Sequence, residues 1–342
     1  MRKTGLILLL VILLFSGYSQ KSSAASLNGS SGRLPAALLA EKAEQAADRG
    51  LYEFETKELF VQRDGNRIYG VVYLPQNAGE KMPAVLFSHG FGGNYQVGAG
   101  YAEALARKGY VVYCFDFCGG STGSRSDGSP LEMSLFTEQA DLEAVIRMMQ
   151  QQPFVDSRHL FLMGTSMGGA VSAITAAADK EEIQGVILLY PAFVLVDNAK
   201  EQFSSVDEIP ETYPLMWMTV GRAFAEKLLD YDIYQAISAY DKEVLLIHGD
   251  ADPIVPITSS QKAVKAYASS RLKERQMNIS PDEHRRNPWT YRGFLFFTNF
   301  FKQFPTLFLV CIVYGTENTA STVFVSARFI NSATLRTNAD VP

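Results

Sequence analysis

Short apolar runs alternate with longer helical patterns along most of the chain. Five short, mostly apolar runs predict strands, and a continuous apolar run is typical of a strand that is buried on both faces of a parallel sheet. They lie at residues 84–88, 110–115, 159–163, 186–190 and 244–247. Helical patterns occupy residues 101–108, 138–150 and 167–178. Strand followed by helix, repeated, predicts an α/β fold with a mostly parallel central sheet and helices on both faces.

The pattern changes on either side of this alternation. Residues 58–62 and 68–74 predict two strands, and Asp64-Gly65-Asn66 between them favours a hairpin. About fifty residues separate the strands at 186–190 and 244–247, which is more than a simple crossover needs. Aromatic residues, methionines and prolines gather there, so we expect an inserted lid at about 193–240. An ordinary crossover helix with decoration is the alternative.

The first 25 residues predict a secretory signal peptide. Arg2 and Lys3 precede an apolar run at residues 6–15, and small and polar residues follow. The run is short for a bilayer span, so we expect cleavage and a secreted or extracytoplasmic protein with no stable membrane span. An uncleaved anchor that retains the protein at the membrane is the alternative. Residues 26–50 predict a polar linker and an N-terminal helix.

Composition narrows the possible partners. The 342 residues carry a formal net charge of −5 and no basic run beyond the first residues, which argues against a nucleic-acid partner. Cys114 and Cys118 stand roughly 13 Å apart in an extended chain, too far for a disulfide, so we expect free buried thiols. The third cysteine is Cys311. Neither a CxxC nor an HExxH pattern occurs, and we predict no metal or other cofactor.

The chemistry concentrates in Gly164-Thr165-Ser166-Met167-Gly168-Gly169. This segment follows an apolar strand and opens a helix, which is the context in which GxSxG indicates a nucleophile. A sharp turn there presents the Ser166 hydroxyl and requires glycines as neighbours. The N–H of Met167 lies at the positive end of the helix and is a candidate oxyanion donor. The alternative is a glycine-rich turn without chemistry.

Two further segments supply possible companions of Ser166. Residues 88–93, Ser-His-Gly-Phe-Gly-Gly, follow a strand, and the N–H of Phe91 is the second candidate oxyanion donor. We expect His89 to brace this loop. Asp252 follows the strand at 244–247, where the carboxylate that orients a catalytic histidine is expected. Asp250 competes with it, although we expect Asp250 to cap the turn.

These segments resemble bacterial α/β-hydrolase esterases, and among them the cinnamoyl (feruloyl) esterase-like group. Residues 116–121, Asp-Phe-Cys-Gly-Gly-Ser, and Met133-Ser134 before a helix add to the resemblance, which covers about residues 55–273. It implies an α/β-hydrolase domain at 51–273 that cleaves small carboxylic esters through a Ser-His-Asp triad and an acyl-enzyme. Candidates for contact with the acyl group are the lid residues Tyr213, Trp217 and Phe224. Ordinary packing inside the lid would explain them equally well.

The catalytic histidine is the weak point of the resemblance. Chain order places it after Asp252, which leaves His284 as the candidate base. The group has its histidine about seven residues beyond the position of Lys273, after a short strand; here that position is Ser280, and no clear strand precedes it. Residues 274–342 do not match and are predicted to be a divergent tail; a reading-frame change near Lys273 is one hypothesis.

The unmatched tail leaves alternatives to an esterase open. One is a non-catalytic or impaired hydrolase fold that lacks a properly placed histidine. The other is a peptidase or thioesterase that uses the same triad.

Overall fold

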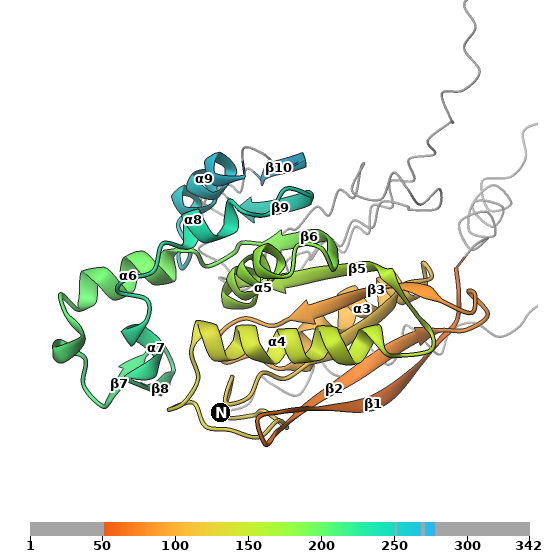
Figure 1. Ribbon diagram of the computed structural model, residues 1–342, viewed down its shortest axis with the longest axis horizontal. Helices are drawn as coiled ribbons and strands as arrows, with labels where there is room; N and C mark the ends of the chain where they lie inside the picture. The colour runs from red at the N-terminus through yellow and green to blue at the C-terminus, as the bar shows by residue number, and fades with distance from the viewer. Residues whose placement is uncertain (1–50, 250–251, 268–270, 278–342) are drawn as a thin grey trace, which may run out of the picture. The chain divides into compact units, whose positions relative to one another are not determined.

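The computed structural model describes residues 51–249, 252–267 and 271–277, and they form an eight-stranded mixed sheet (Figure 1). Its strand order is β1-β2-β4-β3-β5-β6-β9-β10. The strands are β1 (Phe54–Arg63), β2 (Asn66–Pro75), β3 (Met82–Ser88), β4 (Val111–Phe115), β5 (Val155–Thr165), β6 (Ile183–Leu189), β9 (Glu243–Gly249) and β10 (Arg271–Met277). From β4 to β10 every neighbouring pair is parallel, whereas β2 pairs antiparallel with β1 and β4. The predicted mostly parallel sheet is confirmed.

The first two strands form the predicted hairpin. Arg63 pairs with Asn66, so that only Asp64 and Gly65 make the turn. Both have left-handed φ values, 49° and 88°, as a type I′ turn requires. This turn matches the natural twist of the two strands.

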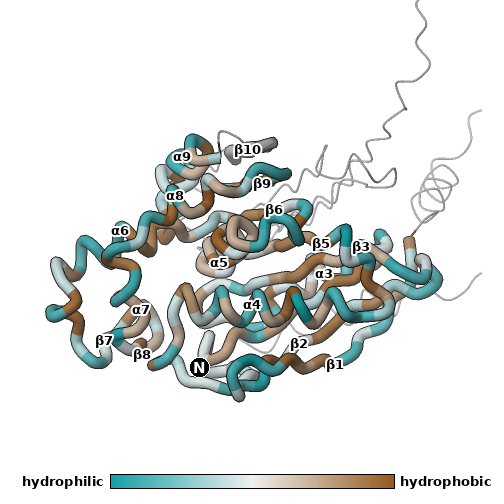
Figure 2. Tube along the Cα trace, in the orientation of Figure 1, coloured by the Kyte–Doolittle hydropathy of each residue, from teal (hydrophilic) through white to brown (hydrophobic). Residues whose placement is uncertain are grey.

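Helices cover both faces of the sheet. One layer contains α4 (Leu135–Gln150), α5 (Ser166–Ala178), α8 (Ile233–Ile237) and α9 (Ile257–Ala266), whereas α3 (Ala99–Ala106) lies on the opposite face (Figure 1). Successive β5 residues alternate between the layers: Leu160 and Leu162 pack with the α4–α5 core, and Phe161 and Met163 with the α3 core. Because these strands are buried on both faces, hydrophobic residues follow one another along them (Figure 2).

Helix α4 carries two buried carboxyl groups. Asp141 accepts a hydrogen bond from the backbone N–H of Cys118 at 2.8 Å and pairs with the guanidinium of Arg63. Glu138 lies one turn earlier with its side chain fully buried, and no hydrogen-bond partner for its Oε2 is found among the described residues. Burial, and after it the charge of Asp141, raise the pKa of Glu138 well above its usual value. Burial therefore favours the protonated, neutral form of Glu138.

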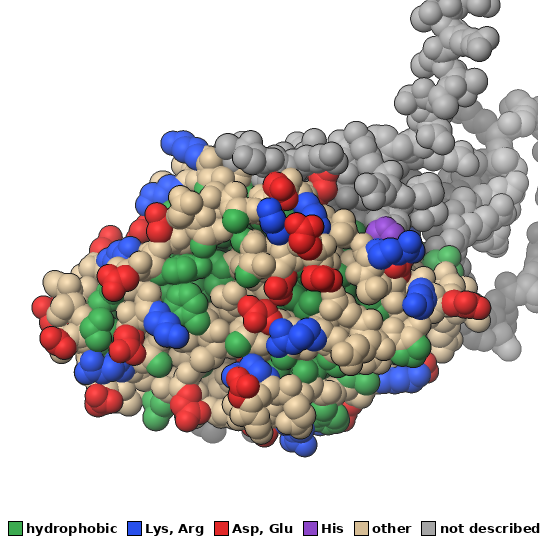
Figure 3. Space-filling view, in the orientation of Figure 1, with side chains coloured by type: hydrophobic (Ala, Val, Ile, Leu, Met, Phe, Trp, Pro, Cys, Tyr) green, Lys and Arg blue, Asp and Glu red, His purple; other side chains and the backbone are tan. Residues whose placement is uncertain are grey.

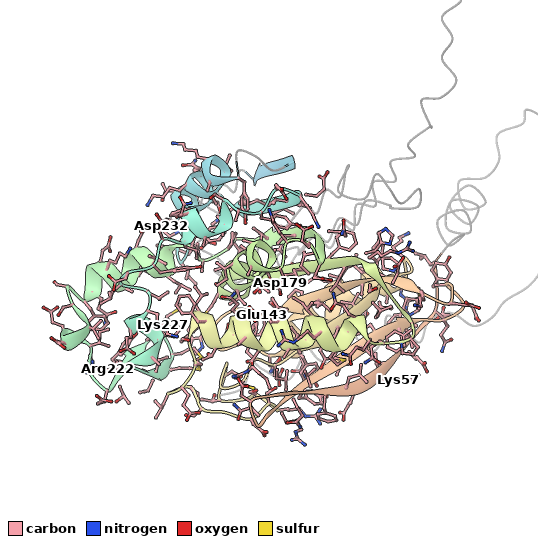
Figure 4. The ribbon with its side chains drawn as sticks, viewed as in Figure 1. Lys57, Glu143, Asp179, Arg222, Lys227 and Asp232 are labelled. Carbon is pink, nitrogen blue, oxygen red and sulfur yellow. The ribbon has the colours of Figure 1, made fainter. Side chains whose placement is uncertain are left out.

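An insertion between β6 and β9 forms the lid. It contains α6 (Val194–Gln202), η2 (Val206–Glu208), α7 (Ala223–Glu226) and a separate antiparallel hairpin of β7 (Thr212–Leu215) and β8 (Met218–Gly221). A second sheet is more than a crossover helix provides, and this favours the lid over the alternative. Lys227 of the lid lies beside the start of α4 (Figure 4), where its Nζ is 5.8 Å from the ring centroid of Phe136.

Strand β10 corrects the expectation that no strand follows Lys273. The strand runs parallel to β9 and ends with Met277 opposite Gly249. Its sequence, RLKERQM, lacks the apolar run by which the other strands were recognised, and its backbone pairing with β9 alone identifies it as a strand. The sheet therefore continues past the boundary that the sequence suggested at residue 273.

Several sequence predictions fall on residues outside the described ranges. These are the signal peptide, the linker and N-terminal helix, Asp250, His284 and Cys311. Cys114 and Cys118 are free and buried, as expected. No helix in the described part of the chain is long and apolar enough to cross a membrane. On the face that carries α4 and α5, acidic and basic side chains are interspersed (Figure 3).

Candidate active site at the carboxyl edge of the sheet

The candidate residues follow strands that end side by side. Ser88 at the end of β3 pairs with Gly164, Thr165 at the end of β5 pairs with Leu189, and Leu189 in turn pairs with Ile247 of β9. Neighbouring strands lie about 4.8 Å apart, so the ends of β5 and β9 are separated by roughly 10 Å. The loops that carry Phe91, Ser166 and Asp252 therefore leave the sheet at one edge, as the carboxyl edge of an open α/β sheet requires of a binding site.

Ser166 occupies a strained turn between β5 and α5. Its φ is +51°, a left-handed value that is uncommon for a residue with a side chain. Space around the turn admits glycine alone: a Cβ on Gly164 would lie 2.2 Å from the carbonyl oxygen of Gly168, and one on Gly168 would lie 2.2 Å from that of His89. The glycine pattern in the sequence thus has a steric cause. Ser166 itself is half-buried rather than enclosed.

The loop after β3 approaches Ser166 through its backbone. A Cβ on Gly90 would lie 3.1 Å from the Cβ of Ser166 and 3.7 Å from its Oγ. The carbonyl of Gly90 accepts hydrogen bonds from the N–H of Gly93 at 3.0 Å and from His89 Nδ1 at 2.8 Å. In a trans peptide the C=O and the next N–H point to opposite sides, so these two bonds also fix the direction of the Phe91 N–H.

His89 braces this loop, as expected from the sequence. Its Nε2 accepts the backbone N–H of Phe117 at 3.2 Å, which leaves the proton on Nδ1 for the carbonyl of Gly90. The side chain is 1% exposed, and burial lowers the pKa of His89, against weaker opposing effects of the Gly90 hydrogen bond and of Asp116. The imidazole of His89 is neutral and both of its nitrogens are hydrogen-bonded, so His89 supports the loop and is not free to act as a base.

Two backbone N–H groups beside Ser166 are available to a bound group. Within the described residues, no hydrogen-bond acceptor is found for the N–H of Phe91 or of Met167. Met167 stands at the start of α5, where the helix dipole adds positive potential. Two such donors next to a serine hydroxyl can stabilise the negative oxygen of a tetrahedral intermediate.

Asp252 follows β9 and uses one of its two carboxylate oxygens to cap the turn. Oδ1 accepts the backbone N–H groups of Ile254 and Val255, both at 2.9 Å. Oδ2 is buried and has no hydrogen-bond partner among the described residues. A buried carboxylate oxygen without a donor is costly, and it marks a place for one more N–H group.

His248 lies near this oxygen, but both of its ring nitrogens form hydrogen bonds with other groups. Its Nε2 is 3.6 Å from Asp252 Oδ2, which is beyond hydrogen-bond range, and it donates to the carbonyl of Val255 at 2.9 Å. Its Nδ1 accepts from Ser260 Oγ at 2.6 Å. Burial lowers the pKa of His248, so this side chain is neutral as well. His248 therefore does not supply a hydrogen bond to Asp252 Oδ2.

Two of the three lid aromatics reach the loop at residues 88–93, which we call the oxyanion loop because it carries the candidate donor Phe91. The Phe91 ring lies 5.7 Å from that of Trp217 and 5.8 Å from that of Phe224, measured between centroids. Tyr213 instead packs on Phe203 inside the lid at 5.3 Å, and burial raises the pKa of Tyr213 to about 12. The packing alternative therefore describes Tyr213 better than contact with substrate does.

Some contacts of the site could not be found from the sequence. Gly120 accepts the N–H of Gly92 at 3.1 Å, which joins the loop after β4 to the oxyanion loop. The indole nitrogen of Trp217 lies where a side chain of Gly92 would begin. The glycines themselves were visible in the motifs, but their partners are distant in the chain.

Sequence comparison finds one family model and several uncharacterized proteins that are similar to this chain. Residues 79–218 match the family model described as serine aminopeptidase, S33. An uncharacterized protein of Mycobacterium tuberculosis is 31% identical over 211 residues, which cover 61% of this chain and 66% of that protein. The alignment thus spans slightly less than two thirds of that relative. The uncharacterized protein YfhR of Escherichia coli O157:H7 is 25% identical over 231 residues, 66% of this chain and 72% of that protein.

Solved structures share the fold at low identity. Est1E from Butyrivibrio proteoclasticus, determined with bound ferulic acid, superposes with a TM-score of 0.58 at 23% identity, over 64% of this chain and 89% of that one. DcsB in complex with its substrate analogue gives a TM-score of 0.52 at 19% identity, over 67% and 91%. The chain has the α/β-hydrolase fold, with a mostly parallel mixed sheet and flanking helices.

Proposed function

We propose that this protein is a serine hydrolase that cleaves carboxylic esters through an acyl-enzyme on Ser166. The observation that carries the proposal is the strained turn at Ser166 between β5 and α5, which we call the elbow. Ser166 is held at φ +51° between glycines that no side chain could replace, and the two N–H groups beside it find no acceptor among the described residues. Strain at a polar residue that the surrounding structure holds in place is typical of a functional site.

The proposed mechanism has two steps. Ser166 Oγ attacks the ester carbonyl while a histidine takes its proton, and the N–H groups of Phe91 and Met167 stabilise the tetrahedral oxyanion. The histidine then protonates the leaving alcohol, and water hydrolyses the acyl-enzyme by the same route. Asp252 Oδ2 accepts the N–H of that histidine and holds its tautomer. The mechanism needs no cofactor.

His284 is the proposed base. Strand β10 supports this choice, because Met277 ends opposite Gly249 and so brings the chain out at the edge where Asp252 lies. Seven further residues can span up to roughly 24 Å. Both His89 and His248 are excluded from the role, since each has both ring nitrogens occupied.

The substrate and location of the protein are part of the proposal. Est1E was solved with ferulic acid bound, and the aromatic ring of Phe91 packs against two lid aromatics, so an acyl group with an aromatic or extended apolar portion is the class we favour. We further propose that the first 25 residues direct export, and that the substrate is a small ester outside the cytoplasm.

The test is hydrolysis of p-nitrophenyl acetate by the purified protein and by Ser166→Ala. Ser172→Ala is the matched control, since Ser172 is a buried serine on the same helix. Turnover that is lost in Ser166→Ala and kept in Ser172→Ala supports the proposal. His284→Ala should then reduce kcat by several orders of magnitude, because the nucleophile loses its base.

A fluorophosphonate probe separates the remaining alternatives. A chain that modifies Ser166 without ester turnover would be a serine hydrolase of another substrate class, such as a thioester or a peptide. A protein that shows no labelling and no turnover would be a non-catalytic hydrolase fold, and the esterase proposal would be wrong.

A further inference from the structure

The tip of the lid hairpin presents two large apolar side chains at a strained turn. Leu215 pairs with Met218, which leaves Met216 and Trp217 as the turn residues. Met216 has a φ of +52°, a value that usually calls for glycine. Both side chains are more than half exposed, 55% for Met216 and 56% for Trp217. Such a tip costs conformational energy, and packing inside the lid does not account for it.

Trp217 lies directly on the backbone of the oxyanion loop. A Cβ on Gly92 would lie 2.2 Å from the indole Nε1 and 3.1 Å from Cε2. Gly92 also has a φ of +68°, so both its conformation and its neighbour require glycine. Trp217 as a whole is nevertheless 56% exposed. The contact therefore joins the lid to the loop without enclosing the indole.

The same contact bears on Phe91, whose N–H is the proposed oxyanion donor. The loop is anchored at Gly90 by two hydrogen bonds and at Gly92 by the carbonyl of Gly120. Phe91 stands between two glycines, which restrain the backbone little. Its ring packs against those of Trp217 and Phe224. The lid thus supplies the side-chain restraint that the flanking glycines cannot.

We propose that Trp217 is a positioning residue: seated on Gly92, it locks the lid hairpin to the oxyanion loop and keeps the Phe91 N–H aligned for the transition state. This inference rests on the proposed esterase function. Its consequence is that the lid controls catalysis as well as access. Loss of the lock weakens stabilisation of the oxyanion whatever the acyl group, because the oxyanion is common to all esters.

A purely substrate-binding role for Trp217 predicts a different result. If the indole contacted only the acyl chain, its removal would raise KM, and the effect would grow from the acetyl to the octanoyl ester. A positioning role lowers kcat by a similar factor for both esters and leaves KM nearly unchanged. Deleting one oxyanion donor lowers kcat by about 10²–10³. A misaligned donor should give a smaller loss, about tenfold to a hundredfold.

The experiment compares p-nitrophenyl acetate and octanoate with the full chain and four variants. Trp217→Ala and Gly92→Ala should both lower kcat, the first by removing the indole and the second by displacing it. Trp217→Phe keeps a ring and should restore part of the activity. Met216→Ala is the matched control, because Met216 shares the tip and the exposure of Trp217 but has no ring on the oxyanion loop. Thermal unfolding confirms that each variant is folded.

The outcomes separate this inference from the proposed function. Activity of the parent chain with unchanged kcat in Trp217→Ala would overturn the inference and leave the esterase standing. A loss that grows with acyl length would overturn the inference in the same way. Absence of ester turnover in the parent chain would instead refute the esterase, and the inference with it.

Discussion

The strain at Ser166 can be measured by exchanging its side chain. Ser166→Ala and Ser166→Gly both remove the hydroxyl, but only alanine keeps a Cβ at φ +51°. The left-handed conformation costs a residue with a Cβ about 1–2 kcal/mol. Glycine avoids that cost, but its greater conformational freedom in the unfolded chain destabilises the folded protein by about 0.4–1 kcal/mol. We therefore expect Ser166→Gly to be more stable than Ser166→Ala by about 0.8 kcal/mol, the difference between the middles of these two ranges.

The assay is urea unfolding followed by circular dichroism, with free energies extrapolated to water. Ser172 provides the control, because it lies on the same helix and is buried. In a regular helix interior glycine is about 1 kcal/mol worse than alanine, so the order must reverse there. If Ser166→Gly proves less stable than Ser166→Ala while the Ser172 pair behaves normally, the elbow is not strained and our interpretation of it is wrong.

Three further predictions concern buried groups. His89 and His248 have lowered pKa values, so the stability they contribute is full above the unfolded pKa of about 6.5 and is lost as pH falls toward their folded pKa values, each by up to about 1.4 kcal/mol per pH unit. Chemical denaturation from pH 7.5 to 5 should show this steep loss, and a flat profile would mean that the fold lowers the pKa of neither imidazole. Glu138 has the opposite sign: its raised pKa means that its contribution is present below the unfolded pKa and is lost as pH rises toward the folded one, so Glu138→Gln should gain on the parent chain in urea unfolding as the pH rises above 4.5. A difference that does not change with pH would show Glu138 to be ionised throughout. Finally, burial raises the pKa of the Cys118 thiol to about 12, so a maleimide at pH 7.5 should modify Cys118 only after denaturation, as peptide mass spectrometry would reveal; rapid native labelling would contradict the burial.

The sequence predicted the parts of the fold that local chemistry dictates. Apolar runs of strand length occur where a strand is covered on both faces, and the five predicted ones are all present. Asp64-Gly65 indicated the hairpin, because few residue pairs accept two successive left-handed conformations. The turn at Ser166 could be predicted equally well. Larger side chains cannot replace its glycines, because atoms within a few residues or on the neighbouring strand occupy the space.

Other features depend on partners that are distant in the chain, and only the tertiary structure decided them. The charged segment at 271–277 becomes a strand because β9 offers it hydrogen bonds, not because of its own pattern. The carboxylate of Asp252 was predictable as a site residue, but the division of its oxygens between a turn and an empty position was not. Trp217 was one aromatic among several until it was found against Gly92, 125 positions earlier in the chain. Periodicity and turn chemistry act over a few residues, whereas burial and close packing depend on which segments the fold brings together.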